Sequence, residues 1–123
     1  LEEYRGYVEA FKLFMAESNT KIEFAETPLY HEIEKWAGTP DIYGYLNGIS
    51  CVIDIKTGQK EKVHGYQLSA YQSLLFVNGY ETINRFGLYL NKNGKYNLVQ
   101  YKERHDKNIF YAALCILRAR EDD

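Results

Sequence analysis

The sequence predicts an α/β fold in which helices cover both faces of a mixed β-sheet, an α/β/α sandwich. Segments with the apolar spacing of amphipathic helices alternate with strand-like segments, in the order helix, three strands, helix, two strands, helix. Helices on both sides of such a sheet would cover its apolar faces. The chain has 123 residues, which suffice for one domain with its own core but not for two, so a single domain over residues 1–123 is expected.

The first elements follow from the apolar spacing. Residues 3–18 are predicted to form an amphipathic helix, because apolar side chains recur at helical intervals at Tyr4, Tyr7, Val8, Phe11, Phe14 and Met15. Residues 21–27 are predicted to form a strand with Ile22 and Phe24 on one side. Residues 29–36 form a connector whose conformation the pattern leaves open.

An Asn-Gly pair marks the strongest local signal, a hairpin over residues 39–57. Asn47 and Gly48 tolerate the positive φ of a two-residue turn, and apolar, β-branched or aromatic runs flank them. Counting outward from this turn sets Asp41 directly opposite Asp54, on the same face. The alternative is a register shifted by one residue, which would place the two aspartates on opposite faces.

The second strand of the hairpin alternates between an apolar core face and a polar working face. Its core face would carry Ile49, Cys51, Ile53 and Ile55, and its working face Ser50, Val52, Asp54 and Lys56.

The second half of the chain continues the alternation of helix and strand. A polar loop is expected at residues 57–64 and a helix at residues 65–78. Strands at residues 85–90 and 96–101 would form a second hairpin. Asp106 is expected to cap a final helix that reaches about residue 120. That helix is predicted to be buried through Ile109, Phe110, Ala113, Leu114 and Leu117.

Composition excludes several classes of function. The net charge of −2 gives the chain no overall attraction for a polyanion, so nucleic-acid binding would need a local basic patch. No apolar run reaches the length of a membrane span and nothing resembles a signal peptide, so a cytoplasmic protein without membrane contact is expected. Cys51 and Cys115 are too few for a disulfide framework or a four-cysteine iron–sulfur site and are expected to be two buried free thiols in a reducing cytosol.

Two carboxylates and a lysine are predicted to share the working face. Lys56 follows Asp54 by two residues and points to the same side. Facing carboxylates repel, so Asp41 and Asp54 imply a bound cation or a shared proton. Carboxylates suit Mg²⁺ or Mn²⁺, and the Ile55 carbonyl could add a neutral ligand. Lys56 could orient a water molecule, help to deprotonate it or stabilise developing negative charge. The two aspartates and this lysine therefore fit metal-dependent hydrolysis of a phosphodiester.

The same residues resemble a known family. Segments 40–41 (Pro-Asp) and 54–56 (Asp-Ile-Lys) resemble the PD-(D/E)xK nuclease superfamily. The lead-in 38–41 (Gly-Thr-Pro-Asp) and the segment 67–71 (Gln-Leu-Ser-Ala-Tyr) are similar to its RecB/Cas4-like exonuclease branch. The resemblance covers roughly residues 23–78, and the remainder of the chain by the order of its elements.

This resemblance implies a restriction-endonuclease-like fold and a divalent-metal-dependent DNA nuclease, expected to be an exonuclease of DNA repair, recombination or phage replication. Asp41 and Asp54 would be metal ligands and Lys56 the catalytic lysine, with Mg²⁺ or Mn²⁺ as cofactor. Gln67 and Tyr71, one helical turn apart, would contact nucleic acid or brace the site. The implied setting is a bacterial or phage-infected cell, with DNA and a recombination or replication protein as partners.

The chain departs from this branch in two ways. The branch draws another metal ligand, His or Glu, from a helix near the N-terminus; the usual histidine motif would precede Leu1, which is not Met, so a missing upstream portion is kept open. Glu9 and Glu26 are candidate substitutes. The four-cysteine cluster of Cas4-type members is missing, so that subgroup is not expected. The alternative function is therefore a catalytically inactive nuclease-fold module that binds nucleic acid or protein.

A basic loop lies beside the candidate site in the sequence. Lys60, Lys62 and His64 would suit phosphate contacts, and Lys60 is assigned to nucleic-acid binding; a solvated loop is the alternative. His64 and His105 are expected at the surface, and His31 as a partly exposed structural residue. The motifs leave open the polarity of digestion and the preference for DNA or RNA and for one or two strands. Ring-forming and monomeric exonucleases share them, so the oligomeric state is open as well.

Overall fold

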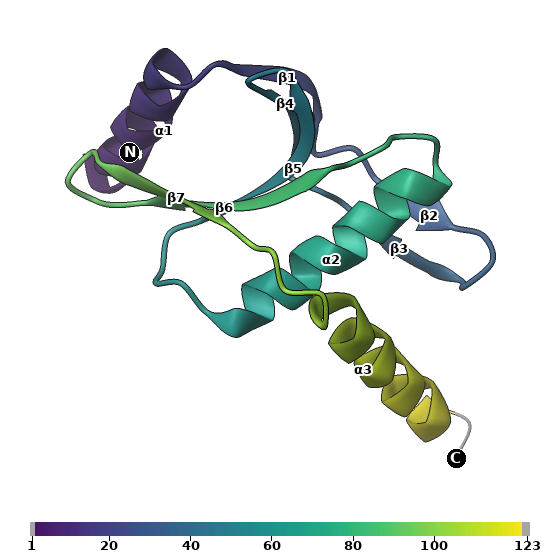
Figure 1. Ribbon diagram of the computed structural model, residues 1–123. Helices are drawn as coiled ribbons and strands as arrows, with labels where there is room; N and C mark the ends of the chain where they lie inside the picture. The colour runs from purple at the N-terminus through teal and green to yellow at the C-terminus, as the bar shows by residue number, and fades with distance from the viewer. Residues whose placement is uncertain (1, 122–123) are drawn as a thin grey trace.

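The computed structural model describes residues 2–121 and places them in a mixed α/β fold (Figure 1). A five-stranded sheet has the order β1-β4-β5-β6-β7, and a separate two-stranded sheet pairs β2 with β3. After a 3₁₀ turn at Glu2–Tyr4, the elements are α1 (Arg5–Glu17), β1 (Thr20–Ala25), β2 (Leu29–His31), β3 (Trp36–Gly38), β4 (Ile42–Leu46), β5 (Ile49–Lys56), α2 (Lys62–Val77), β6 (Asn84–Leu90), β7 (Tyr96–Gln100) and α3 (Asp106–Glu121).

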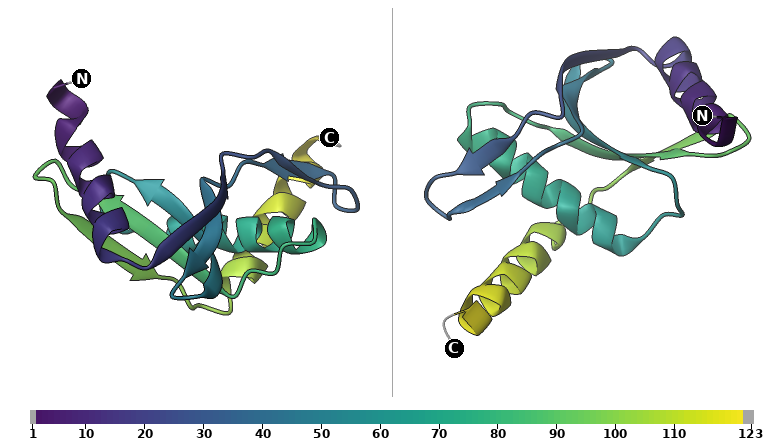
Figure 2. Two further views of the ribbon diagram at one scale, coloured as in Figure 1. Left: turned by 90° about the horizontal axis from the view of Figure 1, so that it is seen from above. Right: turned by 180° about the vertical axis from the view of Figure 1, so that it is seen from behind.

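Helices flank the five-stranded sheet, as the sequence predicts (Figures 1 and 2). β5 and β6 run parallel and are joined through α2, while the other neighbouring strands of this sheet pair antiparallel. α1 packs against β6 and β7, and α2 packs against β5 and β6. The predicted α/β sandwich with a central mixed sheet is confirmed.

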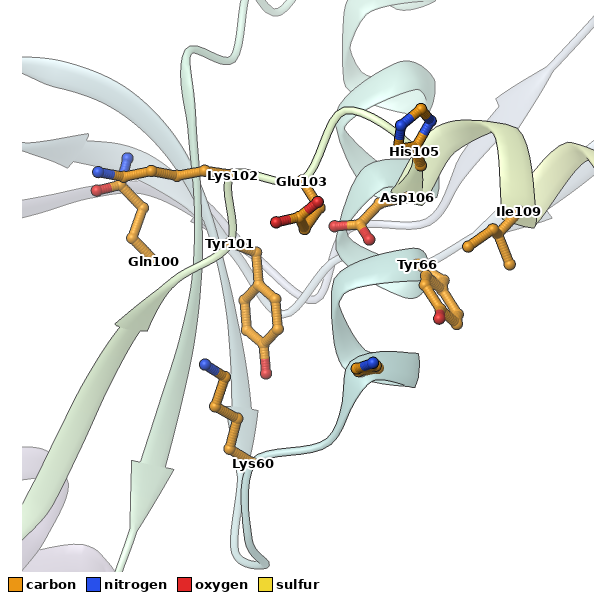
Figure 3. A pocket seen from close by; sticks show the side chains of 10 residues that line it. Lys60, Tyr66, Gln100, Tyr101, Lys102, Glu103, His105, Asp106 and Ile109 are labelled. Atoms are coloured by element: carbon orange, nitrogen blue, oxygen red, sulfur yellow. The ribbon is translucent and has the colours of Figure 1, made fainter.

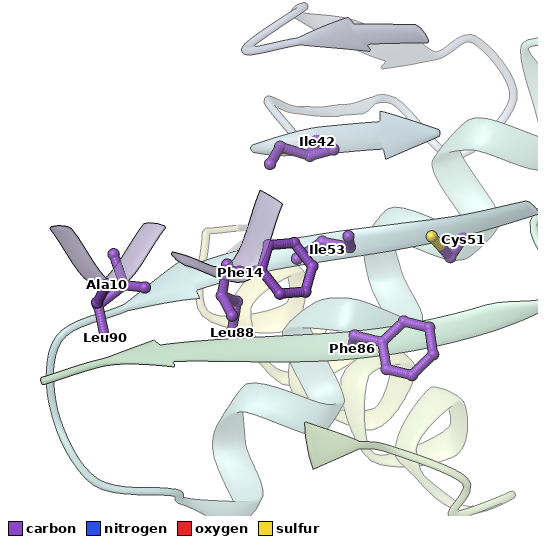
Figure 4. Close-up of a cluster of buried hydrophobic side chains, with 8 residues drawn as sticks. All are labelled: Ala10, Phe14, Ile42, Cys51, Ile53, Phe86, Leu88 and Leu90. Atoms are coloured by element: carbon purple, nitrogen blue, oxygen red, sulfur yellow. The ribbon is translucent and has the colours of Figure 1, made fainter. Parts of the chain in front are cut away.

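Each face of the sheet has its own apolar core. On the α1 side, fully buried Phe14 belongs to a cluster with Ile53 and Leu88 of the central strands (Figure 4). On the α2 side, Leu68 and Leu75 pack against tyrosines of the sheet. Burying a side chain of this size stabilises the fold by roughly 1.5–3 kcal/mol. Strand β5 lies between the two cores, which fixes the position of the residues it carries.

The predicted hairpin forms in the predicted register. Asn47 and Gly48 have φ of 52° and 78°, the positive values that a two-residue turn requires. In the ladder between β4 and β5, the outermost pair is Ile42 with Ile53. The next position outward therefore aligns the two predicted aspartates.

The predicted working face of β5 is buried rather than open to water. Ser50, Val52 and Asp54 are at most 8% exposed, because α2 packs over this side of the strand. Helix α2 also begins earlier than predicted, at Lys62, so Lys62 and His64 belong to the helix and not to a loop. The prediction of a wholly polar loop at residues 57–64 is wrong in its last three positions.

Strand β1 contains an irregularity that the sequence pattern did not indicate. Ile22 pairs with Gly44, whereas Phe24 pairs with Tyr43, the adjacent residue of β4. The register therefore shifts between Ile22 and Phe24, as in a β-bulge. The two side chains consequently point to opposite faces of the sheet, and only Phe24 joins the core on the α2 side.

Helix α3 is mostly exposed, although the sequence predicts its burial. Asp106 begins the helix as predicted, but its carboxylate is buried and paired with Arg85 at 3.4 Å. Of the five apolar residues predicted to bury the helix, only Phe110 and Leu114 are partly covered. Cys115 on the same helix is exposed, so its predicted burial is wrong, whereas Cys51 is a buried free thiol as predicted. Phe110 packs against Trp36 of the β2–β3 hairpin, the element that occupies the connector left open by the pattern. None of the described helices has the length and apolarity needed to cross a membrane.

Candidate active site

Two aspartates meet where the β4–β5 hairpin opens. Asp41 immediately precedes β4, and its Oδ2 accepts a 2.8 Å hydrogen bond from the backbone N–H of Ile55. This hydrogen bond extends the β4–β5 ladder beyond its last pair, Ile42 with Ile53, with a side-chain carboxylate in place of a backbone carbonyl as the acceptor. Asp54 lies in β5 and is only 3% exposed. The structure thus brings together the two carboxylates that the sequence predicts to face each other.

Lys56 links these carboxylates to helix α2. Its Nζ lies 2.9 Å from Asp54 Oδ2 and donates a 3.1 Å hydrogen bond to Gln67 Oε1. Gln67 Nε2 donates in turn to the Tyr71 hydroxyl at 3.2 Å. The network therefore runs without a break from β5 to α2 and joins four predicted site residues: Asp54, Lys56, Gln67 and Tyr71. Both the oxygen and the nitrogen of the Gln67 amide are hydrogen-bonded within this network. This fits the bracing role better than direct contact with nucleic acid.

The two charged groups at the centre have shifted protonation equilibria. Burial, and then the nearby Asp41, raise the pKa of Asp54 to about 6, and the Lys56 ammonium opposes that rise. Burial lowers the pKa of Lys56, but its 2.9 Å approach and charge attraction to Asp54, together with the charge of Asp41, outweigh burial, so its pKa is raised overall. At neutral pH Lys56 is therefore an ammonium, suited to orienting a group or stabilising negative charge and not to accepting a proton.

The residues present fit a hard divalent cation in one specific respect. Asp54 Oδ2 is buried and has no hydrogen-bond partner among the described residues. The short approach of Lys56 to this oxygen is therefore an ion pair without the direction of a hydrogen bond. In a strand, the N–H and C=O of one residue point to the same edge, so the Ile55 carbonyl points to the side on which its N–H meets Asp41. Two carboxylates and this carbonyl match the oxygen ligands that Mg²⁺ prefers.

A third protein carboxylate or histidine does not join this pair within residues 2–121. Glu9, one suggested substitute, lies on α1 at the other face of the sheet and pairs with Lys12 at 3.9 Å. Glu26, the other, donates its backbone N–H to the Asp41 carbonyl at 2.9 Å, but its side chain is exposed. Neither substitute completes a cluster of metal ligands with the two aspartates.

His64 is largely buried in the structure, whereas the sequence predicts it at the surface. Its side chain is only 15% exposed, and its Nδ1 lies 2.7 Å from the Tyr89 hydroxyl. Tyr89 pairs with Lys56 across the parallel β5–β6 ladder, and its hydroxyl contacts that of Tyr101. Burial, and then the positive charge of Lys56, lower the pKa of His64. The signal that could have found it is its spacing of three and seven residues from Gln67 and Tyr71 on one helix face.

Lys60 lies in the loop between β5 and α2, with its Nζ 5.8 Å from the centre of the Tyr101 ring. With Lys62 it lines a pocket of about 620 Å³ (Figure 3), and neither Asp41 nor Asp54 belongs to the lining. His105 lines the same pocket and is exposed, as expected. The predicted basic segment is therefore near the candidate site without touching its acids.

His31 is buried rather than partly exposed. Its Nδ1 accepts a 3.1 Å hydrogen bond from the backbone N–H of Glu34, and its ring stacks on Trp36. These contacts stabilise the turn between β2 and β3, which agrees with the structural role that the sequence suggests.

Comparison with known proteins adds no assignment to this geometry. No family model matches the chain, and no curated protein matches it either.

Proposed function

We propose that the chain is a divalent-metal-dependent DNA nuclease, most simply an exonuclease, that hydrolyses phosphodiester bonds with Mg²⁺ or Mn²⁺. One observation carries the proposal: a buried carboxylate oxygen of Asp54, without a hydrogen-bond partner among the described residues, faces Asp41 and the ammonium of Lys56. Desolvated like charges raise the free energy of a fold, and the Lys56 ammonium offsets this only in part, because the pKa of Asp54 is still raised to about 6 beside it. A divalent cation is the ligand that such a pair of carboxylates holds best.

The chain's own residues have separate tasks in this reaction. A cation held by Asp41, Asp54 and the Ile55 carbonyl would supply Lewis-acid activation of water and charge neutralisation. Lys56 would hold its ammonium toward the phosphate oxygens and stabilise the negative charge that develops there. Gln67 fixes the position of that ammonium through the 3.1 Å hydrogen bond. Tyr71 in turn fixes the Gln67 amide.

The direct test is cleavage of linear DNA in Mg²⁺ or Mn²⁺ by the wild type, Asp54→Asn and Lys56→Ala. We expect both variants to lose at least about a hundredfold in rate, the scale on which removal of one charge-stabilising group acts. Glu32→Gln and Lys95→Ala remove the same charges at exposed positions and should retain full activity. A closed circular substrate distinguishes digestion from ends from internal cutting. Equal rates for the wild type, Asp54→Asn and Lys56→Ala would refute the assignment.

The small number of metal ligands favours a second candidate function. Because no third His, Cys, Asp or Glu joins the pair within the described residues, a nuclease-fold module that binds nucleic acid or protein without catalysis is the alternative. Calorimetric titration with Mg²⁺ and a product assay on the same sample separate the two. Binding of DNA with no product at any metal concentration would favour the binding module. A recombination or replication protein stays a predicted partner under either function.

A further inference from the structure

A basic pocket adjoins the candidate site on the α2 side of the sheet. It is the pocket of about 620 Å³ described above, formed by the loop before α2, the start of α2, the end of β7 and the start of α3 (Figure 3). Tyr101 forms part of its wall and contacts Tyr89 through their hydroxyls. Tyr89 is the β6 partner of Lys56. The pocket therefore begins only two side chains away from the predicted catalytic lysine.

Three lysines from two segments line this pocket. Lys60, Lys62 and Lys102 line it, and none has a carboxylate within ion-pair distance among the residues that the structure describes. Of the two acids in the lining, Asp106 is buried and already paired with Arg85. The exposed Glu103 is the other. In a chain with a net charge of −2, this pocket thus carries a local excess of positive charge, because its three lysines outnumber the one carboxylate not paired with Arg85, and such an excess attracts phosphate groups.

The opposite side of the pocket offers an apolar and aromatic surface. Figure 3 shows Tyr66 and Ile109 together on one side, with Lys60 and Lys102 on the other. Tyr66 is partly exposed and Ile109 is 43% exposed, so both are accessible to a ligand. The volume falls within the range of about 300–1,000 Å³ that is usual for small-molecule sites. It therefore has room for the base and the phosphate of one nucleotide.

We propose that this pocket binds one unpaired nucleotide of the nucleic-acid strand, with the phosphate on the lysines and the base against Tyr66. The inference rests on the proposed function and adds a substrate class to it. A base inside a duplex cannot present its face to a tyrosine, whereas an unpaired base stacks on one readily. The pocket thus selects a single strand or a frayed end, held beside the site where cleavage would occur.

Binding of fluorescein-labelled single-stranded DNA of about 20 nucleotides, measured by anisotropy without divalent metal, tests this pocket separately from catalysis. The variant Lys62→Ala/Lys102→Ala should bind about tenfold more weakly, and its salt dependence should fall by about 0.7 in log–log slope, the value for one lost phosphate contact on a single strand. Lys92→Ala/Lys95→Ala is the matched control at the β6–β7 turn and should bind as the wild type does.

The aromatic half of the proposal has its own variants. Tyr66→Leu should weaken single-strand binding about fivefold or more, since stacking of one base is lost, and should leave the salt slope unchanged. Tyr66→Phe keeps the ring and should bind normally. A blunt duplex of the same sequence should bind equally to the wild type and Tyr66→Leu. Melting curves of each variant, compared with the wild type, show that the fold is retained.

Each outcome decides for or against the pocket. Absence of any DNA binding by the wild type, or equal losses in the two double-lysine variants, would overturn the inference. If Asp54→Asn abolishes cleavage while the pocket variants bind normally, the proposed function holds and the pocket does not contribute. If the wild type cleaves no DNA but the pocket variants lose binding selectively, the nuclease proposal fails and the nucleotide pocket is supported.

Discussion

Replacing Asp54 by Asn should abolish activity and at the same time make the metal-free protein more stable. The carboxylate of Asp54 is 3% exposed, and burial together with Asp41 raises its pKa from an ordinary 3.8 to about 6. Between those two pH values the folded chain binds more protons than the unfolded chain does. The free energy of unfolding therefore falls as the pH rises through this window, and it stays reduced above pH 6.

The size of the effect follows from the shift. A shift of about two pKa units corresponds to about 3 kcal/mol at 1.36 kcal/mol per unit, and this is the most that ionised Asp54 costs the fold above pH 6. Asn has the same shape without the charge, so the variant avoids this cost. For a chain of 123 residues, with an unfolding entropy of about 2.1 cal/mol/K per residue, the gain in Tm is at most about 12 °C.

Thermal melts followed by circular dichroism, with EDTA present, would measure this gain. The wild type and Asp54→Asn should melt close together at pH 4, separate between pH 4 and 6, and differ most at pH 7–8. Glu32→Gln neutralises an exposed acid and should show no such divergence. If Asp54→Asn melts at or below the wild type at pH 8, or if the difference is the same at pH 4 and pH 8, the strained-carboxylate argument is wrong.

Three further predictions concern the same network. Mg²⁺ at about ten times its Kd should raise the stability of the wild type by about 1.4 kcal/mol, a gain that a thermal melt should not find in Asp41→Asn, because one ligand is lost. At metal concentrations well below the Kd, the nuclease rate should fall about tenfold per pH unit below pH 6, as Asp54 becomes protonated and no longer binds the cation; a flat pH profile down to pH 5 at such metal concentrations would exclude an essential ionised Asp54. Tyr71→Phe removes the hydroxyl that holds Gln67 and should lower kcat several-fold without unfolding the chain, with a neutral hydrogen bond worth about 0.5–1.5 kcal/mol.

The sequence predicted the centre of the candidate site because local chemistry determines it. Asn47 and Gly48 fix the turn, the turn fixes the register, and a period of two then places Lys56 on the side of Asp54. The position of Gln67 above that face depends on how α2 packs on the sheet, which the periodicity of the chain does not predict. Only the resemblance of segment 67–71 to a family motif indicates that Gln67 belongs to the site.

The predictions that the structure contradicts depend on long-range contacts, which the local sequence pattern does not contain. The sequence pattern places His64 in a loop because α2 has no capping signal at its start: Glu61 at the N-cap makes no side-chain hydrogen bond to the helix. Burial of the α2-facing side of β5 depends on a long-range crossover. The exposure of α3 has the same origin, since apolar spacing predicts a face that can be buried but not a partner that buries it. Phe110 and Leu114 find such a partner only in part.

The cost of Asp54 bears directly on the choice between the two proposed functions. A domain of ordinary stability has only about 5–15 kcal/mol in total, so a carboxylate that costs up to about 3 kcal/mol is a large fraction of it. A module that only binds DNA through lysines gains nothing from this buried charge. A nuclease does gain, because a cation that binds the two aspartates recovers the cost when it binds and is then held in place for catalysis. A stability gain in Asp54→Asn that Mg²⁺ closes by raising the wild type alone would therefore argue for the enzyme, even before a cleavage product is measured.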